Sequence, residues 1–303
     1  MFSANPKRHK LQPTFMVKVV STINLKGGVG KTQMTVAIAE FLAKEHHKKV
    51  LLIDLDPQTN ATVLLMKETE WLRKDQAGET LLQLFKDKLD KTSKFDIDDA
   101  IVEGVSNVGG GIAKLDLLPS SLGLIEIQDS LPLISAGKFF VTSPVTILKE
   151  AIENNLKAYD YVLIDCPPNL GIITLNGLYF SDSYIIPCIP DILSTYGIPQ
   201  IIGRVNSFKK DAQVNVKPLG IVISMYRAQS RLHDSMMGDL RGRVRLPVTD
   251  KKWAPRVFDA VIPLSVRTAE AADFAAPVNT LKQKYGTMFG PYNELTDEFI
   301  RVA

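Results

Sequence analysis

A glycine-rich segment near the start of the chain combines residue types that bind phosphate. The segment lies between an apolar run, 17–23, and an amphipathic run, 35–43, and reads Lys26-Gly27-Gly28-Val29-Gly30-Lys31-Thr32. Glycines let successive backbone N–H groups point at one anion, and the N-terminus of a following helix adds its positive dipole. Lys31 would reach the β- and γ-phosphates, and the Thr32 hydroxyl would hold Mg²⁺. The order predicts a strand, a phosphate-binding loop and a helix; a plain glycine turn with surface lysines is the alternative.

The segment departs from the general P-loop pattern G-x-x-x-x-G-K-[ST], because Leu25 stands where the first glycine belongs. An additional lysine, Lys26, opens the loop instead. In this respect the segment resembles the deviant P-loop of the ParA/MinD ATPases, in which that lysine is the signature residue. The resemblance implies that Lys26 crosses an ATP-sandwich dimer and contacts the phosphates bound by the other subunit. A cation supplied by a partner would couple hydrolysis to dimerisation, as an arginine finger does.

The same resemblance implies ATP as the nucleotide and Mg²⁺ as its metal. A strand expected over 216–224 ends where this family closes over the adenine base, which adds Met225 to the set. The nucleotide-binding residues expected on this basis are Gly27, Gly28, Val29, Gly30, Lys31, Thr32, Gln33 and Met225.

Two carboxylates, Asp54 and Asp56, lie at the end of the run 50–54, which reads as a strand buried on both faces of a parallel sheet. Open α/β sheets bind ligands at the carboxyl ends of their strands. The segment Asp54-Leu55-Asp56-Pro57-Gln58 resembles the D-x-D-P-Q segment of the ParA family. By that match Asp56 positions the attacking water and Asp54 supports the Mg²⁺ shell; a solvated turn is the alternative.

A second acidic strand end lies at Asp165, after the apolar run that begins at Tyr159. An apolar strand that ends in an acid is the Walker B arrangement, in which the carboxylate accepts from a Mg²⁺-bound water. Together with the Cys166-Pro167-Pro168 that follows, the segment resembles the family's switch II. The expected metal set is therefore Thr32, Asp54 and Asp165.

Length and composition favour one large α/β domain, because 303 residues with 45% hydrophobic content can bury a large core. We expect a mainly parallel twisted sheet with helices on both faces over 17–303, although the length alone also allows two domains.

Residues 1–16 read as a basic leader, either disordered or an accessory contact to DNA or a partner. We expect no operator-binding module before Val17, so the chain looks like a short ParA form. With two cysteines and no signal core, we expect a soluble cytoplasmic protein.

Other expected elements carry no chemistry that the sequence identifies. Gly109-Gly110-Gly111 predicts a hairpin or flexible connector rather than a second phosphate site, because 112–118 reads as a strand. Ser120 is expected to cap a helix that runs to about 131, and Ser143-Pro144 to open another that runs to about 156. A strand over 184–190 and a helix over 194–209 complete the pattern.

Positive charge is concentrated between residues 201 and 267, which hold 13 Lys and Arg against five acids, a surplus of eight where the whole chain has +3. This matches the footprint of a non-specific DNA-backbone binder, and a solvated charged surface is the alternative. Segment 257–267 resembles a family segment whose final arginine, here Arg267, helps bind DNA; Leu264 stands where the family often has arginine. The candidate DNA-binding residues are Arg227, Arg241, Arg243, Arg245, Lys251 and Arg267.

The resemblance implies a partition ATPase that dimerises with ATP, coats nucleoid DNA and is released when a ParB-like or other cargo adaptor stimulates hydrolysis. The cargo would be a plasmid, a chromosome origin or a protein assembly. A MinD-like membrane-cycling ATPase is the main alternative, but the end of the chain, 293–303, has three acids and one arginine where a membrane anchor is rich in Lys and Arg, so we expect no stable membrane anchoring.

Two further functions of related folds remain as alternatives. An iron–sulfur reductase would bridge a cluster through Cys166 and Cys188, although buried structural cysteines explain both more simply. A tyrosine kinase would need a C-terminal tyrosine cluster, which Tyr285 and Tyr292 do not form.

Overall fold

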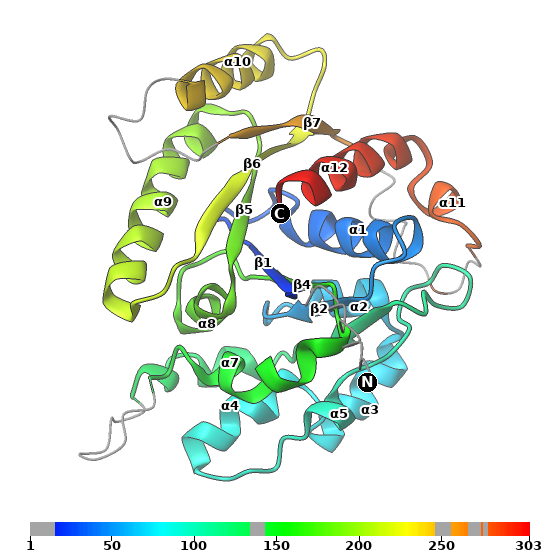
Figure 1. The fold of residues 1–303 in the computed structure, drawn as a ribbon, viewed down its shortest axis with the longest axis vertical. Helices are drawn as coiled ribbons and strands as arrows, with labels where there is room; N and C mark the ends of the chain where they lie inside the picture. The colour runs from blue at the N-terminus through cyan, green and yellow to red at the C-terminus, as the bar shows by residue number, and fades with distance from the viewer. Residues whose placement is uncertain (1–15, 134–142, 246–255, 266–273, 275–277) are drawn as a thin grey trace, which may run out of the picture.

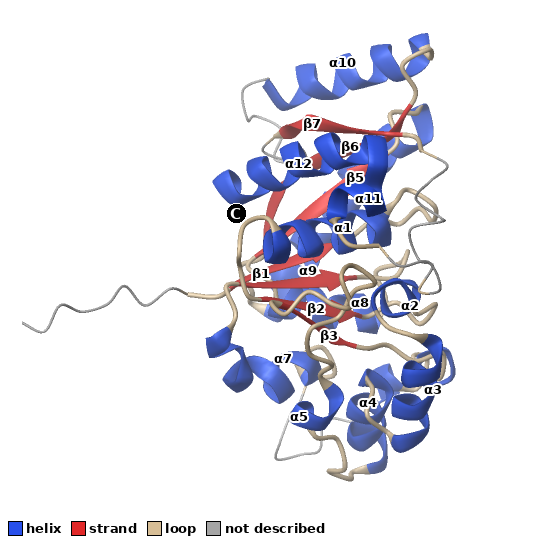
Figure 2. Ribbon diagram, turned by 90° about the vertical axis from the view of Figure 1, so that its right-hand side faces the viewer, coloured by secondary structure: helices blue, strands red, loops and turns tan. Residues whose placement is uncertain are grey.

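A computed structural model describes residues 16–133, 143–245, 256–265, 274 and 278–303. Within them the chain forms a seven-stranded sheet in the order β3-β2-β4-β1-β5-β6-β7, and each strand pair is parallel. Helices cover both faces of the sheet (Figures 1 and 2). The predicted α/β class, with a parallel sheet between helical layers, is confirmed.

The strands are short and apolar, as expected for a sheet covered on both faces. Strands β2 and β4 are buried over their whole length. The expected strand at 50–54 has those bounds, whereas the one expected from Tyr159 begins two residues later. The strands are β1 (Lys18–Thr22), β2 (Val50–Asp54), β3 (Leu115–Leu118), β4 (Tyr161–Asp165), β5 (Ser183–Cys188), β6 (Lys217–Tyr226) and β7 (Val257–Pro263).

The register of the central strands sets three polar residues side by side. Asp165 pairs with Thr22 on one side and with Asp54 on the other, and each of the three is the last residue of its strand. Because all three strands run in the same direction, their last residues lie at one edge of the sheet. This edge is where the phosphate-binding segment leaves β1.

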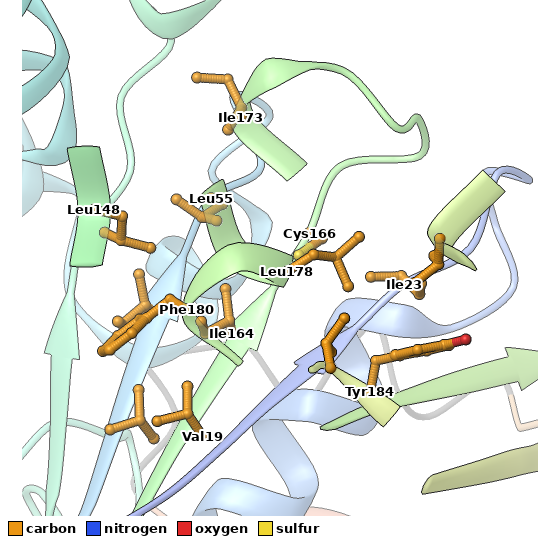
Figure 3. Packing of buried hydrophobic residues seen from close by; sticks show 14 of the residues in the cluster. Val19, Ile23, Leu55, Leu148, Ile164, Cys166, Ile173, Leu178, Phe180 and Tyr184 are labelled. Atoms are coloured by element: carbon orange, nitrogen blue, oxygen red, sulfur yellow. The ribbon is translucent and has the colours of Figure 1, made fainter. Parts of the chain in front are cut away.

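Two groups of helices enclose two hydrophobic clusters, one on each face of the sheet. The first face carries α1 (Lys31–Lys44), α2 (Asn60–Leu65), α3 (Glu68–Ala77), α11 (Leu281–Tyr285) and α12 (Phe289–Val302). The second face carries α4 (Leu81–Asp90), α5 (Ile97–Ala100), α6 (Leu124–Ile127), α7 (Ile147–Ile152), α8 (Ile172–Phe180), α9 (Ile192–Ala212) and α10 (Arg231–Arg245). Figure 3 shows part of the second cluster, in which Leu55, Ile164 and Leu178 lie close together beside the strand ends.

Two expected helix starts are wrong. Ser120 does not cap a helix; its Oγ donates to the carbonyl of Asp56 at 2.8 Å, and α6 begins only at Leu124. Ser143 does not open α7 either, because α7 follows Thr146 and ends at Ile152. Ser120 uses its side chain for a tertiary contact, whereas Ser143 lies in a turn in which its carbonyl accepts a hydrogen bond from Thr146 Oγ1 at 2.9 Å. A local capping pattern cannot distinguish either position from a cap.

Candidate nucleotide-binding site

The glycine-rich segment forms an open loop between β1 and α1. Gly28 and Gly30 have φ angles of 71° and 81°, in the left-handed region that glycine adopts without strain. A Cβ added at Gly27 or Gly28 would have no other heavy atom within 4 Å, so the loop backbone faces open space there. Val29 lies on the opposite side: it is buried, and its carbonyl accepts a hydrogen bond from Ser224 Oγ at 2.8 Å. The loop therefore presents its backbone outward at the strand edge.

Lys31 begins α1 and is only 6% exposed. Its Nζ donates to the carbonyl of Lys26 across the loop at 3.4 Å, a long hydrogen bond. Burial lowers the pKa of Lys31, and the nearby charges of Asp165 and Asp56 act in the opposite direction. The ammonium is thus held at the base of the loop, where an anion would strengthen its charged form.

Asp165 ends β4 beneath this loop and is fully buried. Burial raises the pKa of Asp165 to about 7, while hydrogen bonding by Thr32 and the charge of Lys31 act to lower it. Thr35 Oγ1 lies 3.3 Å from Asp165 Oδ1, whereas Oδ2 has no hydrogen-bond partner within the described chain. The buried carboxylate of Asp165 and the Thr32 hydroxyl that hydrogen-bonds to it are hard oxygen ligands of the kind that Mg²⁺ takes, directly or through water. The donor set of Thr32 and Asp165 therefore fits the metal.

Asp54 is the last residue of β2 and the register partner of Asp165 on β4. Unlike Asp165, it accepts hydrogen bonds from the protein on both carboxylate oxygens. Its Oδ2 accepts from Thr62 N at 2.8 Å and from Thr62 Oγ1 at 2.7 Å, and its Oδ1 accepts from Asp56 N at 3.1 Å. Burial and the charge of Asp165 raise the pKa of Asp54 well above its usual range. Asp54 therefore holds the segment between β2 and α2 in place, with both of its oxygens occupied.

Asp56 lies in that held segment and is 5% exposed. Its Oδ1 accepts from Gln58 N at 3.0 Å, and its backbone carbonyl accepts from Ser120 Oγ. Its charge affects the pKa of both Lys31 and Asp165, so the three charged groups share one site. Sequence reasoning did not identify Ser120 as a support for this loop.

Met225 closes the site from β6. It has a φ angle of 50°, unusual for a residue with a side chain, and its Cε would lie 3.7 Å from a Cβ built on Gly30. The preceding residue, Ser224, is the donor to Val29. The end of β6 thus packs against the loop through Ser224, which was not foreseen, and the role of Met225 beside adenine stays a prediction.

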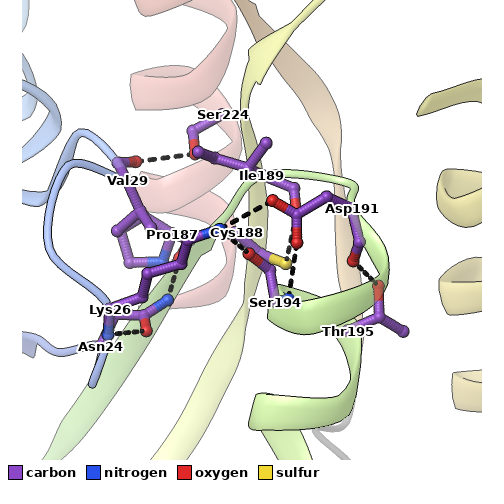
Figure 4. Close-up of polar contacts among 10 residues, drawn as sticks. All are labelled: Asn24, Lys26, Val29, Pro187, Cys188, Ile189, Asp191, Ser194, Thr195 and Ser224. Carbon is purple, nitrogen blue, oxygen red and sulfur yellow. Dashed lines mark hydrogen bonds and ion pairs between the residues drawn. The ribbon is translucent and has the colours of Figure 1, made fainter. Parts of the chain in front are cut away.

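The side chain of Lys26 contacts residues of its own chain in this structure. Its Nζ lies 2.7 Å from Asp191 Oδ2 and 3.3 Å from Ser194 Oγ, at the start of α9 (Figure 4). Asp191 was not singled out from the sequence. A helix-start signal at Asp191, three residues before Ser194 and three residues after the end of β5, would have indicated a carboxylate at this edge of the sheet.

Among the described residues, the positively charged segment 201–267, hereafter called the basic third, does not form one compact patch. Arg227 is exposed just after β6, near the loop, whereas Lys217 and Arg256 line a hollow with Lys18 at the starting ends of the strands. Helix α9 runs between these two edges, which places Lys209 and Lys210 at the end remote from the loop.

The three arginines at 241, 243 and 245 fall within helix α10, so their spacing of two does not put them on one face. Arg241 Nη2 donates to the carbonyl of Asp259 at 3.2 Å, and Arg243 Nε pairs with Asp239 at 2.6 Å. The side chain of Arg245 is not described, and Lys251 and Arg267 lie outside the described residues.

Both cysteines are buried, and burial raises the pKa of Cys166, and of Cys188 to about 12, which opposes a thiolate ligand. Over the described ranges there is no cluster of three or more His, Cys, Asp or Glu that could hold a metal. Tyr285 and Tyr292 pack in the core against Phe41. These positions fit structural roles for all four residues.

The segment 293–303, which a C-terminal membrane anchor would use, lies almost entirely within α12. Leu295 and Phe299 are buried, and Glu298 accepts hydrogen bonds from the backbone of β7 at Asp259 and Ala260. The apolar side of this helix is therefore packed inside the fold. In the part of the chain that the structure describes, no helix has the length and apolar content needed to cross a membrane.

Sequence comparison identifies relatives for most of the chain. A family model for an AAA domain matches residues 17–218. The sporulation initiation inhibitor protein Soj of Bacillus subtilis (strain 168) is 30% identical over 264 residues, which cover 87% of this chain and 90% of Soj.

Structure comparison finds the same fold in solved proteins. Cobyrinic acid a,c-diamide synthase of Mycobacterium smegmatis, with a bound ATP analogue and magnesium, is 25% identical with a TM-score of 0.69 over 94% of this chain and 95% of that one. A plasmid partition protein of Borrelia burgdorferi bound to AMPPNP is 22% identical, with a TM-score of 0.70 over 94% of this chain and 99% of that one.

Proposed function

The chain belongs to the Soj/ParA family of P-loop ATPases of the partition or positioning type, and on that premise we propose that it hydrolyses ATP as a homodimer bound to DNA. The observation that carries the proposal is the arrangement at the strand edge. An open glycine loop lies above the buried ammonium of Lys31 and above Asp165 Oδ2, which has no hydrogen-bond partner among the residues that the structure describes. This is a site for a polyphosphate with its cation.

Each residue of the site has a distinct task in this proposal. The backbone N–H groups of 27–33 and the ammonium of Lys31 bind the phosphates of ATP. Thr32 and Asp165 hold Mg²⁺, which would neutralise phosphate charge when bound. Asp56 orients the attacking water, and Asp54 supports the metal shell by fixing the backbone of the segment that carries Asp56. Met225 contributes to the adenine side of the site.

Dimerisation brings Lys26 of one subunit to the phosphates of the other, so that the dimer is the form competent for turnover. The dimer binds DNA without sequence preference through the basic third, including Arg227 and the undescribed Lys251 and Arg267. A ParB-like or other cargo adaptor stimulates hydrolysis and releases the dimer from nucleoid DNA. The packed C-terminal helix α12 supports a cycle without stable membrane anchoring.

The proposal predicts that purified protein with ATP and Mg²⁺ retards random-sequence DNA at low salt. Lys31→Ala should lower ATP affinity on the order of a hundredfold, about 3 kcal/mol, because a charge-assisted contact to phosphate is lost, and should abolish the DNA shift. Lys26→Ala should keep ATP binding and lose the shift. Absence of retardation by the wild-type protein would exclude the DNA-bound dimer, and ATP-dependent pelleting with liposomes would favour the membrane-cycling alternative.

A further inference from the structure

The contacts of Lys26 form a small polar network between the phosphate-binding loop and the start of α9 (Figure 4). Lys26 N donates to Asn24 Oδ1 at 2.8 Å, and Asn24 Nδ2 donates in turn to the carbonyl of Pro187 at 2.7 Å. The side chain of Lys26 then reaches Asp191 Oδ2 at 2.7 Å and Ser194 Oγ at 3.3 Å. The backbone of Lys26 is thus anchored to the end of β5, and its ammonium to the helix that follows.

The two oxygens of Asp191 have separate tasks. Oδ1 accepts from Ser194 N at 2.6 Å and caps α9, whereas Oδ2 holds Lys26. Burial raises the pKa of Asp191, but hydrogen bonds from Lys26 and Ser194 outweigh that effect and leave it below the usual value. The carboxylate therefore stays charged across the neutral range and available to Lys26.

We propose that Asp191 is a latch, a positioning residue that holds Lys26 within its own subunit until an ATP-bound partner competes for it. This inference rests on the proposed function, in which Lys26 acts across the dimer. A single ammonium held at 2.7 Å by Asp191 must leave that carboxylate to reach phosphates in another subunit. The latched state is favoured in the monomer, and dimerisation must overcome it.

The exposure of the pair makes the latch weak enough to open. The side chains of Lys26 and Asp191 are 41% and 28% exposed, and ion pairs at such positions contribute little free energy. A latch of that strength reduces the population of dimer-competent subunits several-fold without blocking them. Its effect is to raise the concentration of ATP-bound protein that is needed for dimerisation, so that fewer dimers form at low protein concentration.

The test is Asp191→Asn, which keeps a side-chain oxygen for the α9 cap, since Asn caps as well as Asp, but removes the charge that holds Lys26. Sedimentation of the protein with AMPPNP and Mg²⁺ should show dimerisation at a three- to five-fold lower protein concentration, about 1 kcal/mol. Ser194→Ala, which removes the weaker contact, should act in the same direction by a smaller factor. Asp211→Asn makes the same charge change near the far end of α9 and should leave dimerisation as in the wild type.

Lys26→Ala separates the latch from the proposed function. If it dimerises normally with AMPPNP, the trans role of Lys26 fails, and the latch fails with it. If Lys26→Ala abolishes dimerisation while Asp191→Asn and Ser194→Ala match Asp211→Asn, the latch alone is refuted. Weaker dimerisation of Asp191→Asn would refute it too, because Asp191 would then support the dimer. Equal melting temperatures of all variants and an unchanged monomer affinity for AMPPNP show that the effect acts on association and not on folding.

Discussion

The strand-edge site and the basic third place their charged residues by different means. At the strand edge, Asp54 and Asp165 are neighbours because β2 and β4 pair in register, and their burial shifts the pKa values of both. In the basic third, the described arginines and lysines are spread over both ends of the strands, and some are already engaged, such as Arg243 with Asp239. The first region has a geometry set by backbone pairing, and the second is a surplus of charge on several surfaces.

This difference determines what a substitution can do in each region. Removing a group from the strand edge leaves buried polar partners without compensation, so its effect is large and specific. Removing one exposed cation changes a screened, distributed attraction by a small amount. Three predictions, in order of decreasing effect, test whether the two regions behave in these ways.

The largest effect is expected for Asp56→Ala. Loss of the group that orients the attacking water should lower kcat by about 10² to 10⁴ and change ATP affinity little, because Asp56 is not assigned to the phosphates. The variant should therefore bind ATP, dimerise and stay on DNA. The measurement is single-turnover hydrolysis together with DNA retention after long incubation with ATP. Rapid release of the variant from DNA would remove Asp56 from the catalytic role.

A second, intermediate effect is expected for Asp165→Asn, with opposite signs for binding and stability. The pKa of Asp165 in the folded state, about 7, lies above the unfolded value of about 3.9. The folded state therefore holds an extra proton between roughly pH 4 and 7, and the free energy of unfolding falls as pH rises through that window. A neutral amide avoids this cost.

In EDTA and without nucleotide, Asp165→Asn should raise the free energy of unfolding by about 1 to 3 kcal/mol at pH 8, and by less at pH 5. The same variant should lose Mg²⁺-dependent ATP binding. Urea denaturation at both pH values measures the first effect and calorimetry the second, with Asp211→Asn as an exposed control. Destabilisation at pH 8 would show that the hydrogen bonds to Thr32 and Thr35 outweigh the cost of burying the charge.

Most of the strand edge could be predicted from the sequence, because each motif lies at or soon after the end of an apolar run that forms a strand. A residue at the end of a parallel strand has its position set once the strand is recognised. Lys31, Asp56 and Asp165 were placed together in this way, and the structure brings them together. The α/β class followed from the same alternation of strands and helices.

The supporting contacts could not be predicted, because they join residues far apart in the sequence. Lys26 and Asp191 are separated by 165 positions, and Val29 and Ser224 by 195. A lone Asp or Ser in a sequence has the same appearance whether it caps a helix, solvates a turn or holds a distant loop. Ser120 illustrates the ambiguity: it was expected as a cap and instead supports Asp56.

The smallest effect is expected in the basic third, where Arg227 and Arg243 form a matched pair. Both are exposed, but Arg227 lies near the phosphate-binding loop whereas Arg243 is paired with Asp239 at 2.6 Å on its own helix. Arg227→Ala should weaken binding of random-sequence DNA uniformly and reduce the salt slope by about one, while Arg243→Ala should reduce it by less, because Asp239 already offsets that charge. Fluorescence anisotropy with ATP at several salt concentrations measures both slopes, and ATPase activity should stay unchanged. Equal slopes for both variants would mean that local pairing does not decide which cations contact DNA. The basic third would then act only through its number of positive charges, whereas the strand edge acts through the positions of its charged groups.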